Sequence, residues 1–367
     1  MSVIKVNEIR KFSGTEIEIS NPVKFGDGAT VDGAFEATGA NNLSHGMFTK
    51  SDYTKVAWKK TAVFSVSTDQ ELKVEVGGRV FTIADNTAVS MPTAPAVGTD
   101  CTIWINPNGT LQASASFSTP TSTGARKLGG FHYAGGSNAT FAVNAGDGNT
   151  TPQINAFSFY DLRFKPSARD PRGLTLCGGA FWAGIYHLAA AHLTGPPHRN
   201  GTNPARDGAT IPNINGTGNY PNASPMNLFE ILAFHGFRPP SVFDFQLLTY
   251  GTTEAASRGN DPLTTGLGTS NEGSSNADQK FTSTWGVIQS TGVLWHWTND
   301  PSILETTDQT LPNPARGGRF RISRFGFLGG FWGNAAISGS RSVANFTATI
   351  AGSSVGARGV CDHVILE

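Results

Sequence analysis

The stretch WGVIQSTGVLWHW, residues 285–297, decides the fold of this chain. Its short apolar runs are separated by glycine and bounded by tryptophan, which is typical of short strands joined by tight turns. Words of the same kind follow, namely GGFW at 329–332, SGSR at 338–341 and GARG at 356–359. The single arginines in these words predict turns that are held by hydrogen bonds from guanidinium to backbone carbonyls.

The composition of the whole chain agrees with a β-rich, loop-rich protein. The 367 residues include 44 Gly and 20 Pro, and only 15% are charged, against about 25% in an ordinary soluble chain. The apolar and aromatic content excludes disorder, and neither collagen periodicity nor coiled-coil heptads appear. Because 27 basic residues balance 27 acidic ones, the chain lacks the charge that nucleic-acid or anionic-membrane binding requires. Two or three domains are expected.

Residues 1–46 are predicted to form a segment of short strands that cannot fold alone. The runs 4–6 and 16–19 alternate between apolar and polar residues, as half-buried strands do. The segment has too few apolar residues to bury a core by itself. We therefore expect it to pair with identical copies in an intertwined oligomer.

Residues 47–165 are predicted to form a β-sandwich. The alternating runs 72–76 and 79–83 flank Gly77-Gly78, which predicts a hairpin. The runs 101–105 and 110–113 flank the turn-forming residues 106–109, which predicts a second hairpin. Several short strands at this spacing are typical of a sandwich.

Residues 166–367 are predicted to form an α+β domain with three helices. The first would cover 178–193, where Phe181, Ile185, Leu188 and His192 follow helical spacing. The second would begin at Ser224-Pro225, present Leu228, Ile231 and Leu232, and end at Gly236. The third would begin at Ser241, with Asp244 completing a capping box, carry Phe243 and Leu247, and end at Gly251. Residues 252–280 are predicted to be a polar loop.

One apolar run, residues 174–193, is about long enough to span a membrane. His187 and His192 interrupt it, and Gly178-Gly179 break it near its start. A core strand followed by a buried helix is the preferred interpretation. The N-terminus carries no apolar run of the signal-peptide type.

Residues with chemical potential form no convincing catalytic or metal site. The three cysteines, Cys101, Cys177 and Cys361, have no zinc or disulfide spacing and are expected to be free and buried. His187 and His192 are five apart, off a shared helix face, so we expect one at the core edge and one on the surface. No cofactor and no metal ion are expected.

Two further motifs contain residues of the catalytic or metal-binding type. Cys361 and His363 could share a strand face, but no orienting group stands out for a nucleophilic cysteine. The run Trp297-Thr298-Asn299-Asp300 approaches a lectin calcium motif, but the threonine spoils the match.

The glycine-tryptophan words resemble the C-type-lectin-like fold that is shared with formylglycine-generating enzymes. From about Phe48 to the C-terminus, the chain more closely resembles the major tropism determinants, a family of trimeric bacteriophage tail-fibre adhesins. The most specific words are ARKLGGFHYA (125–134), DPRG (170–173) with GAFWA (179–183), YGTTEA (250–255) and GVCDHVILE (359–367). The first 46 residues resemble segments that join tail fibres to the virion.

This resemblance implies a homotrimer with an N-terminal intertwined β segment (1–46), a β-sandwich (47–165) and a C-terminal lectin-like domain (166–367). It implies a virion location at the fibre tip and binding of a host bacterial surface receptor, either protein or glycan. It also implies attachment to other tail proteins through the N-terminal segment. We expect neither binding to nucleic acid nor insertion into a membrane.

Matched by the shared words, the receptor-binding positions of the family fall in three groups. These are Phe331, Gly333, Ala335 and Ile337, then Ala344, Phe346 and Thr347, and finally Ile350, Gly352, Ser354 and Val355. Exposed apolar residues among them would mark an interface. Core packing of Ile350 and Val355 is the alternative for those two positions.

Two other functions remain open from the sequence. The chain could be a structural tail or baseplate protein that docks other virion proteins. An enzyme of the formylglycine-generating type is disfavoured, because that branch uses two cysteines near the C-terminus and only Cys361 lies there. We therefore expect a protein that is not an enzyme.

Overall fold

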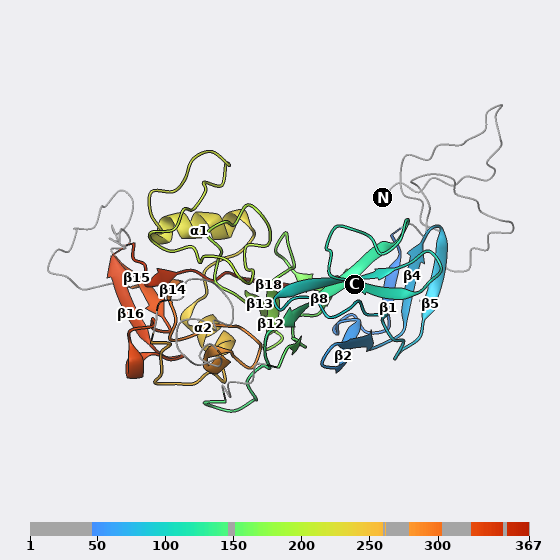
Figure 1. The fold of residues 1–367 in the computed structure, drawn as a ribbon, viewed down its shortest axis with the longest axis horizontal. Helices are drawn as coiled ribbons and strands as arrows, with labels where there is room; N and C mark the ends of the chain where they lie inside the picture. The colour runs from blue at the N-terminus through green and yellow to red at the C-terminus, as the bar shows by residue number, and fades with distance from the viewer. Residues whose placement is uncertain are drawn as a thin grey trace, which may run out of the picture. The chain divides into compact units, whose positions relative to one another are not determined.

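The computed structural model describes residues 46–145, 151–259, 261, 279–302, 324–347 and 351–366. This part of the chain is mainly β, with two α-helices that come between strands β13 and β14 in chain order (Figure 1). The predicted intertwined segment at 1–46 lies outside the described residues except for Gly46.

The first ten strands form three small sheets. The orders are β1-β4-β5, β10-β8-β6-β7 with β9 paired to β8, and the hairpin β2-β3. The strands are β1 (Phe48–Lys50), β2 (Trp58–Ala62), β3 (Ser65–Thr68), β4 (Leu72–Val76), β5 (Arg79–Ile83), β6 (Thr99–Ile105), β7 (Leu111–Ser114), β8 (Arg126–Ala134), β9 (Gln153–Ile154) and β10 (Tyr160–Asp161).

Both predicted hairpins are confirmed. Strands β4 and β5 pair antiparallel from Leu72 opposite Ile83 to Val76 opposite Arg79. Gly77 and Gly78 between them have φ of 59° and 77°, the left-handed region that a two-residue hairpin turn requires. Strands β6 and β7 pair across residues 106–110, where Asn106 exchanges backbone hydrogen bonds with Thr110 and Gly109.

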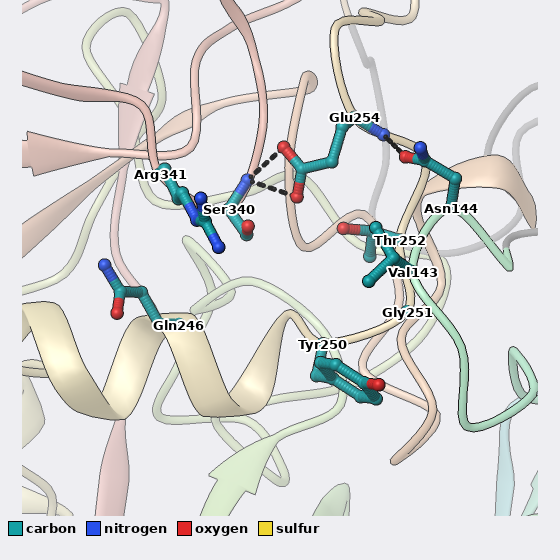
Figure 2. Close-up of a pocket in the computed structure, with 9 residues that line it drawn as sticks. All are labelled: Val143, Asn144, Gln246, Tyr250, Gly251, Thr252, Glu254, Ser340 and Arg341. Carbon is teal, nitrogen blue, oxygen red and sulfur yellow. Dashed lines mark hydrogen bonds between the residues drawn. The ribbon is translucent and has the colours of Figure 1, made fainter.

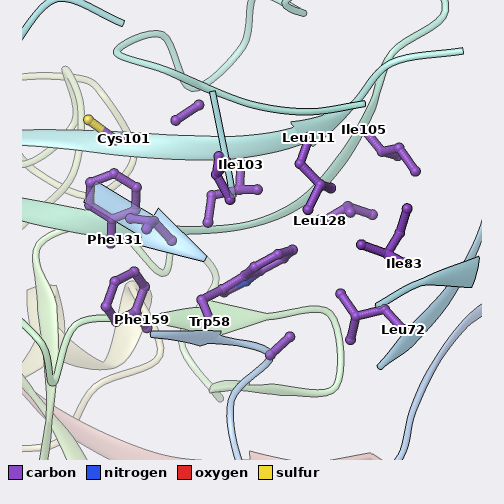
Figure 3. Packing of buried hydrophobic residues seen from close by; sticks show 14 of the residues in the cluster. Trp58, Leu72, Ile83, Cys101, Ile103, Ile105, Leu111, Leu128, Phe131 and Phe159 are labelled. Carbon is purple, nitrogen blue, oxygen red and sulfur yellow. The ribbon is translucent and has the colours of Figure 1, made fainter. Parts of the chain in front are cut away.

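All three of these sheets contribute to one hydrophobic core. Trp58 of β2 is fully buried and lies among Leu72 of β4, Ile103 of β6 and Phe131 of β8 (Figure 3). Cys101 is buried in the same cluster. Burial of such large side chains contributes about 1.5–3 kcal/mol each, so this core is the main stabilising element of the region.

A buried ion pair ties the first strand to the end of this region. Lys50 Nζ lies 2.8 Å from Asp161 Oδ2, and both side chains are fully buried. Asp161 also accepts hydrogen bonds from the backbone N–H groups of Ala57, Arg163 and Phe164. The pair therefore determines how β1 is placed against β10, because each charge would be costly to bury alone.

The remaining strands form two four-stranded sheets, β11-β18-β13-β12 and β16-β15-β14-β17. These strands are β11 (Phe164–Pro166), β12 (Leu174–Cys177), β13 (Phe181–Gly184), β14 (Trp295–Ser302), β15 (Arg324–Leu328), β16 (Val343–Thr347), β17 (Val355–Gly356) and β18 (Val360–Ile365). The helices are α1 (Pro225–Phe234) and α2 (Val242–Leu248), with 3-10 turns η1 (Gln279–Phe281) and η2 (Ala335–Ile337). Trp182 of β13, Trp297 of β14 and Phe327 of β15 share one buried cluster.

The second and third predicted helices are confirmed. Helix α1 follows the N-cap Ser224, has proline in its first turn and buries Leu228, Ile231 and Leu232. Helix α2 follows Ser241, whose side chain accepts from the backbone N–H of Asp244 in a complete capping box. Its buried residues are Phe245 and Leu248, whereas the predicted Phe243 is 82% exposed.

The predicted helix over 178–193 is wrong. Gly178 and Gly179 have φ of 60° and 71°, and they form the turn between β12 and β13. All four residues of β13 are buried. The sequence of a strand that is buried on both faces is continuously apolar, so its periodicity does not distinguish it from a buried helix. Beyond it, the N–H groups of Leu188, Ala189 and Ala190 bond to distant carbonyls rather than along a helix.

The expectation that one of the two histidines, His187 or His192, lies on the surface is also wrong. His187 and His192 are both buried. The ring nitrogens of His192 lie 3.0 Å from His235 Nε2 and 2.8 Å from the carbonyl oxygen of Pro212. Among the described residues, no helix is long and apolar enough to cross a membrane.

Arg358 confirms the predicted guanidinium-to-carbonyl locking, and Arg341 does not. Arg358 is fully buried; its Nη1 donates to Gly184 O at 2.6 Å and its Nη2 to Ile288 O at 2.7 Å. The side chain thus joins β13 to the loop that precedes β14. Arg341, in the matching SGSR word, is exposed.

Candidate functional site

The loop between β15 and β16, residues 329–342, carries the first group of predicted binding positions. It begins with Gly329 and Gly330, which have φ of 95° and 82°. A Cβ on Gly329 would lie 2.7 Å from Phe245 Cζ, so only glycine fits where the loop leaves the sheet. The chain then forms a bridge between Phe331 and Val293 and the short turn η2.

Polar contacts hold the backbone of this loop in place. Asn334 Oδ1 accepts from the N–H of Phe331 at 2.9 Å. The hydroxyl of Ser257 donates to Trp332 O at 2.8 Å and accepts from the N–H of Ala335 at 3.0 Å. The side chains on this loop are therefore presented from a defined backbone rather than from a free tip.

Three of the four residues of the first group are exposed, and Phe331 is the exception. Ile337 is 67% exposed, Gly333 and Ala335 are exposed, and Phe331 is half-buried. Ala335 has φ of 45°, a strained value for a residue with a side chain, and such strain is concentrated at functional sites.

Trp332 belongs to this face although it was not among the predicted positions. Its ring lies edge-to-face with Phe331, with centroids 5.1 Å apart, and it is only half-buried. The guanidinium of Arg206 lies 5.8 Å from the Trp332 ring, and its Nη1 donates to Ser353 O at 3.0 Å. Arg206 thus connects the first group to the turn of the third. Arg206 is far from this loop in the sequence, so no local pattern indicated that the two would meet.

The second group lies on strand β16. Ala344 is half-buried and packs against the core, while its neighbour Val343 is exposed. The backbones of Phe346 and Thr347 pair with Phe325 and Arg324 of β15, and their side chains lie outside what the structure describes.

The third group is divided. Ile350 lies outside the described residues. Gly352 and Ser354 are half-buried in the turn before β17. Val355 is only 5% exposed and packs in the core beside Trp295, its partner in the parallel pair β14–β17. For Val355 the structure therefore shows the alternative of core packing, and the expectation of an exposed contact residue is wrong at this position.

The residues Phe331, Trp332, Gly333, Ala335 and Ile337 are hereafter called the 331–337 face, and their side chains are aromatic, aliphatic or absent. Aromatic and aliphatic side chains of this kind contribute hydrophobic contact area at interfaces. No carboxylate or histidine stands among its five residues.

The two chemical motifs weighed from the sequence have structural roles. Cys361 is buried, and burial raises the pKa of its thiol to about 11, so the nucleophilic thiolate is disfavoured. His363 Nδ1 accepts a hydrogen bond from Trp182 Nε1 at 2.9 Å. Asp300 Oδ2 accepts from the N–H of Val242 at 2.6 Å, at the start of α2. The described residues contain no cluster of three or more side chains suited to a metal ion.

Comparison with known proteins places the chain among phage adhesins. Residues 55–161 match the family model of the second domain of Mtd. The chain is 39% identical to the tail fiber receptor-binding protein of Bordetella phage BPP-1 over 97% of its own length and 96% of the relative's. The solved structures of the Major Tropism Determinant variants M1 and U1 match with a TM-score of 0.78 and 39% identity, over 87% of this chain and 86% of each of theirs.

Identity of this level over nearly the full length of both chains confirms the resemblance seen in the sequence. The chain therefore belongs to the major tropism determinant family of phage tail-fibre receptor-binding proteins.

Proposed function

We propose that this protein is the tip adhesin of a phage tail fibre and binds a host cell-surface receptor through the 331–337 face. The main support is that Ile337 is 67% exposed and stands on a loop whose backbone is held by Asn334 and Ser257. A contiguous exposed apolar patch usually marks an interaction site, and Ile337 lies on the same loop as Phe331 and Trp332. The neighbouring Phe331 and Trp332 supply the aromatic surface that dominates binding energies.

The proposal extends to the second and third groups, with one change. Ala344, Phe346, Thr347, Ile350, Gly352 and Ser354 remain proposed contact positions, while the buried Val355 is no longer one of them. Contact is short-range, because the formal net charge of zero offers no long-range attraction.

Replacing Phe331 or Ile337 with aspartate is expected to weaken binding of the protein to host cells by about 30-fold, and the double variant is expected to abolish phage adsorption. Loss of one such anchor costs about 2 kcal/mol, and a charge placed on an apolar contact adds desolvation. Cell binding of the purified full chain and adsorption of the phage measure the two effects.

The control is Val80→Asp, which places the same charge on an exposed valine of β5. It should bind like the wild type, and all four variants should melt like the wild type. Wild-type adsorption by the double variant would contradict the proposed face. Failure of the wild-type protein to bind host cells would instead favour a structural role in the tail.

We propose further that the protein acts as a homotrimer in the virion. In this arrangement, residues 1–46 intertwine and join other tail proteins, 47–165 form a β-sandwich, and 166–367 form a C-type-lectin-like domain. The shared core of the first three sheets and the Gly- and Arg-locked C-terminal sheets support these assignments. Three copies would present three binding faces, and linked weak sites gain about a hundredfold or more in avidity.

The trimer is tested by light scattering on the full chain during size-exclusion chromatography. The expected mass is three times that of the 38.7 kDa chain. A monomer mass at micromolar concentration would contradict the trimer without affecting the proposed binding face.

A further inference from the structure

A cavity of about 420 Å³ lies beside the turn that follows the 331–337 face. Its walls come from three segments that are distant in sequence: the loop at 143–144, helix α2 with the residues that follow it, and the turn at 340–341 (Figure 2). The lining residues are Val143, Asn144, Gln246, Tyr250, Gly251, Thr252, Glu254, Ser340 and Arg341. Its volume is within the range of sites that bind small molecules.

Two of the polar residues build the cavity wall. Both carboxylate oxygens of Glu254 accept from the N–H of Ser340, at 3.1 and 3.0 Å. Asn144 Oδ1 accepts from the backbone N–H of Glu254 at 2.8 Å (Figure 2). These bonds fix three separate segments around one space. They use only part of the acceptor capacity of the carboxylate, which has about four lone-pair positions.

Three other polar groups of the lining are unused. Within the described part of the chain, the side chains of Gln246, Tyr250 and Arg341 make no hydrogen bond or ion pair. Figure 2 shows the Arg341 and Gln246 side chains on the same side of the view, from the turn at 340–341 and from helix α2. A guanidinium, an amide and a phenol together offer many donors and a few acceptors.

The charges and apolar surfaces of the cavity select among ligands. Arg341 and Glu254 contribute one positive and one negative charge, so an anion would be repelled by the carboxylate and a cation by the guanidinium. Val143 is 70% exposed and Tyr250 is 38% exposed, which adds apolar surface to the polar rim. A ligand that suits both the paired charges and the apolar surface is uncharged, carries several hydroxyls and has an apolar C–H face.

We propose that this cavity is a subsite for a neutral saccharide of the host surface. The ring would lie against Tyr250 and Val143, and its hydroxyls would bond to Arg341, Gln246 and the free lone pairs of Glu254. The inference rests on the proposed adhesin function and narrows it. Ser342 Oγ donates to Ile337 O, so the turn that holds Arg341 is joined to the 331–337 face, and one glycosylated surface can contact both.

Saturation-transfer NMR on the full chain tests the proposal. The probes are the methyl glycosides of glucose, galactose, mannose, rhamnose and N-acetylglucosamine, with methyl glucuronide and N-acetyl-aspartate amide as charged comparisons. At least one neutral glycoside should show transfer at millimolar concentration, and Arg341→Gln and Gln246→Leu should each reduce it at least tenfold. Arg79→Gln, at an exposed arginine of β5, is the matched control and should leave it unchanged.

Three outcomes would overturn the subsite. These are no transfer to any neutral glycoside, transfer that Arg341→Gln does not alter, or stronger transfer to the acidic amino-acid amide, which would indicate a protein ligand. Each is independent of the host-cell assay. Loss of cell binding in Phe331→Asp with unchanged binding in Arg341→Gln would therefore leave the adhesin function intact and reject only the saccharide.

Discussion

Replacing Arg358 with methionine is expected to lower the free energy of unfolding by about 3–5 kcal/mol. The change leaves the carbonyl oxygens of Gly184 and Ile288 without their buried donor, and each such loss costs about 1–3 kcal/mol. Methionine also cannot replace the planar guanidinium, which bonds at the same time to β13 and to the loop before β14. Methionine keeps part of the stem volume, so the effect reports chiefly on the hydrogen bonds.

Urea denaturation followed by tryptophan fluorescence measures this effect. Arg358→Lys should recover part of the stability, because an ammonium can reach one carbonyl but cannot span both. Arg79→Met, at an exposed position, should change stability by no more than about 0.5 kcal/mol. A midpoint for Arg358→Met equal to that of the control would show that the buried guanidinium does not hold the sheets together.

The second large effect is destabilisation by mild acid. His187, His198 and His296 are all buried, and burial lowers the pKa of each, for His198 to about 3. The ring of His187 stacks on that of His296 with centroids 4.8 Å apart, and the positive charge of buried Arg358 further disfavours protonation. The folded protein therefore keeps these rings neutral at pH values where an unfolded chain would protonate them.

The direction of the pH dependence follows from this difference. Above about pH 6.5 neither state binds the protons, and the full stability is present. As the pH falls below 6.5, the unfolded state gains protons that the folded state does not, so each histidine removes about 1.4 kcal/mol per pH unit. Three such groups remove about 4 kcal/mol per unit, which is large against the usual 5–15 kcal/mol of a folded domain. We expect unfolding between about pH 6 and pH 4.

Urea midpoints measured from pH 8 to pH 4.5 test this expectation. The double variant His187→Phe/His296→Phe keeps two stacked rings without titratable groups and should reduce the slope below pH 6.5 by about 2.8 kcal/mol per pH unit. At pH 8 its only change in stability should come from packing. An unaltered slope in the double variant would mean that other groups are responsible for the acid sensitivity.

Local signals in the sequence were sufficient for much of the secondary structure. The Gly77-Gly78 turn and the cap at Ser241 are interactions among residues close in the chain, and both occur as predicted. Family membership was also evident from the sequence, because long words such as those at 125–134 and 359–367 do not depend on knowing the fold. The positions of the first group, within 331–337, were predicted by matching the shared motifs of the family.

The incorrect predictions concern residues whose environment comes from distant parts of the chain. Residues 178–193 are apolar on every side because β13 is covered on both faces, so their helical spacing carried no information about local structure. Phe243 follows a correct cap, yet the neighbours of α2 bury Phe245 and Leu248 instead. Val355 and His192 likewise show no sequence feature that marks them as buried.

By itself, the sequence determined the turns, the helix caps and the family, because these depend on neighbouring residues or on shared words. Only the tertiary structure decided that Arg358 is buried and bonded to two carbonyls while Arg341 is exposed, although both stand in similar glycine-rich words. The same holds for the cavity, whose wall joins Asn144, Glu254 and Ser340. The physical reason is that burial and hydrogen-bond partners are set by segments more than eighty residues apart, which no local pattern records.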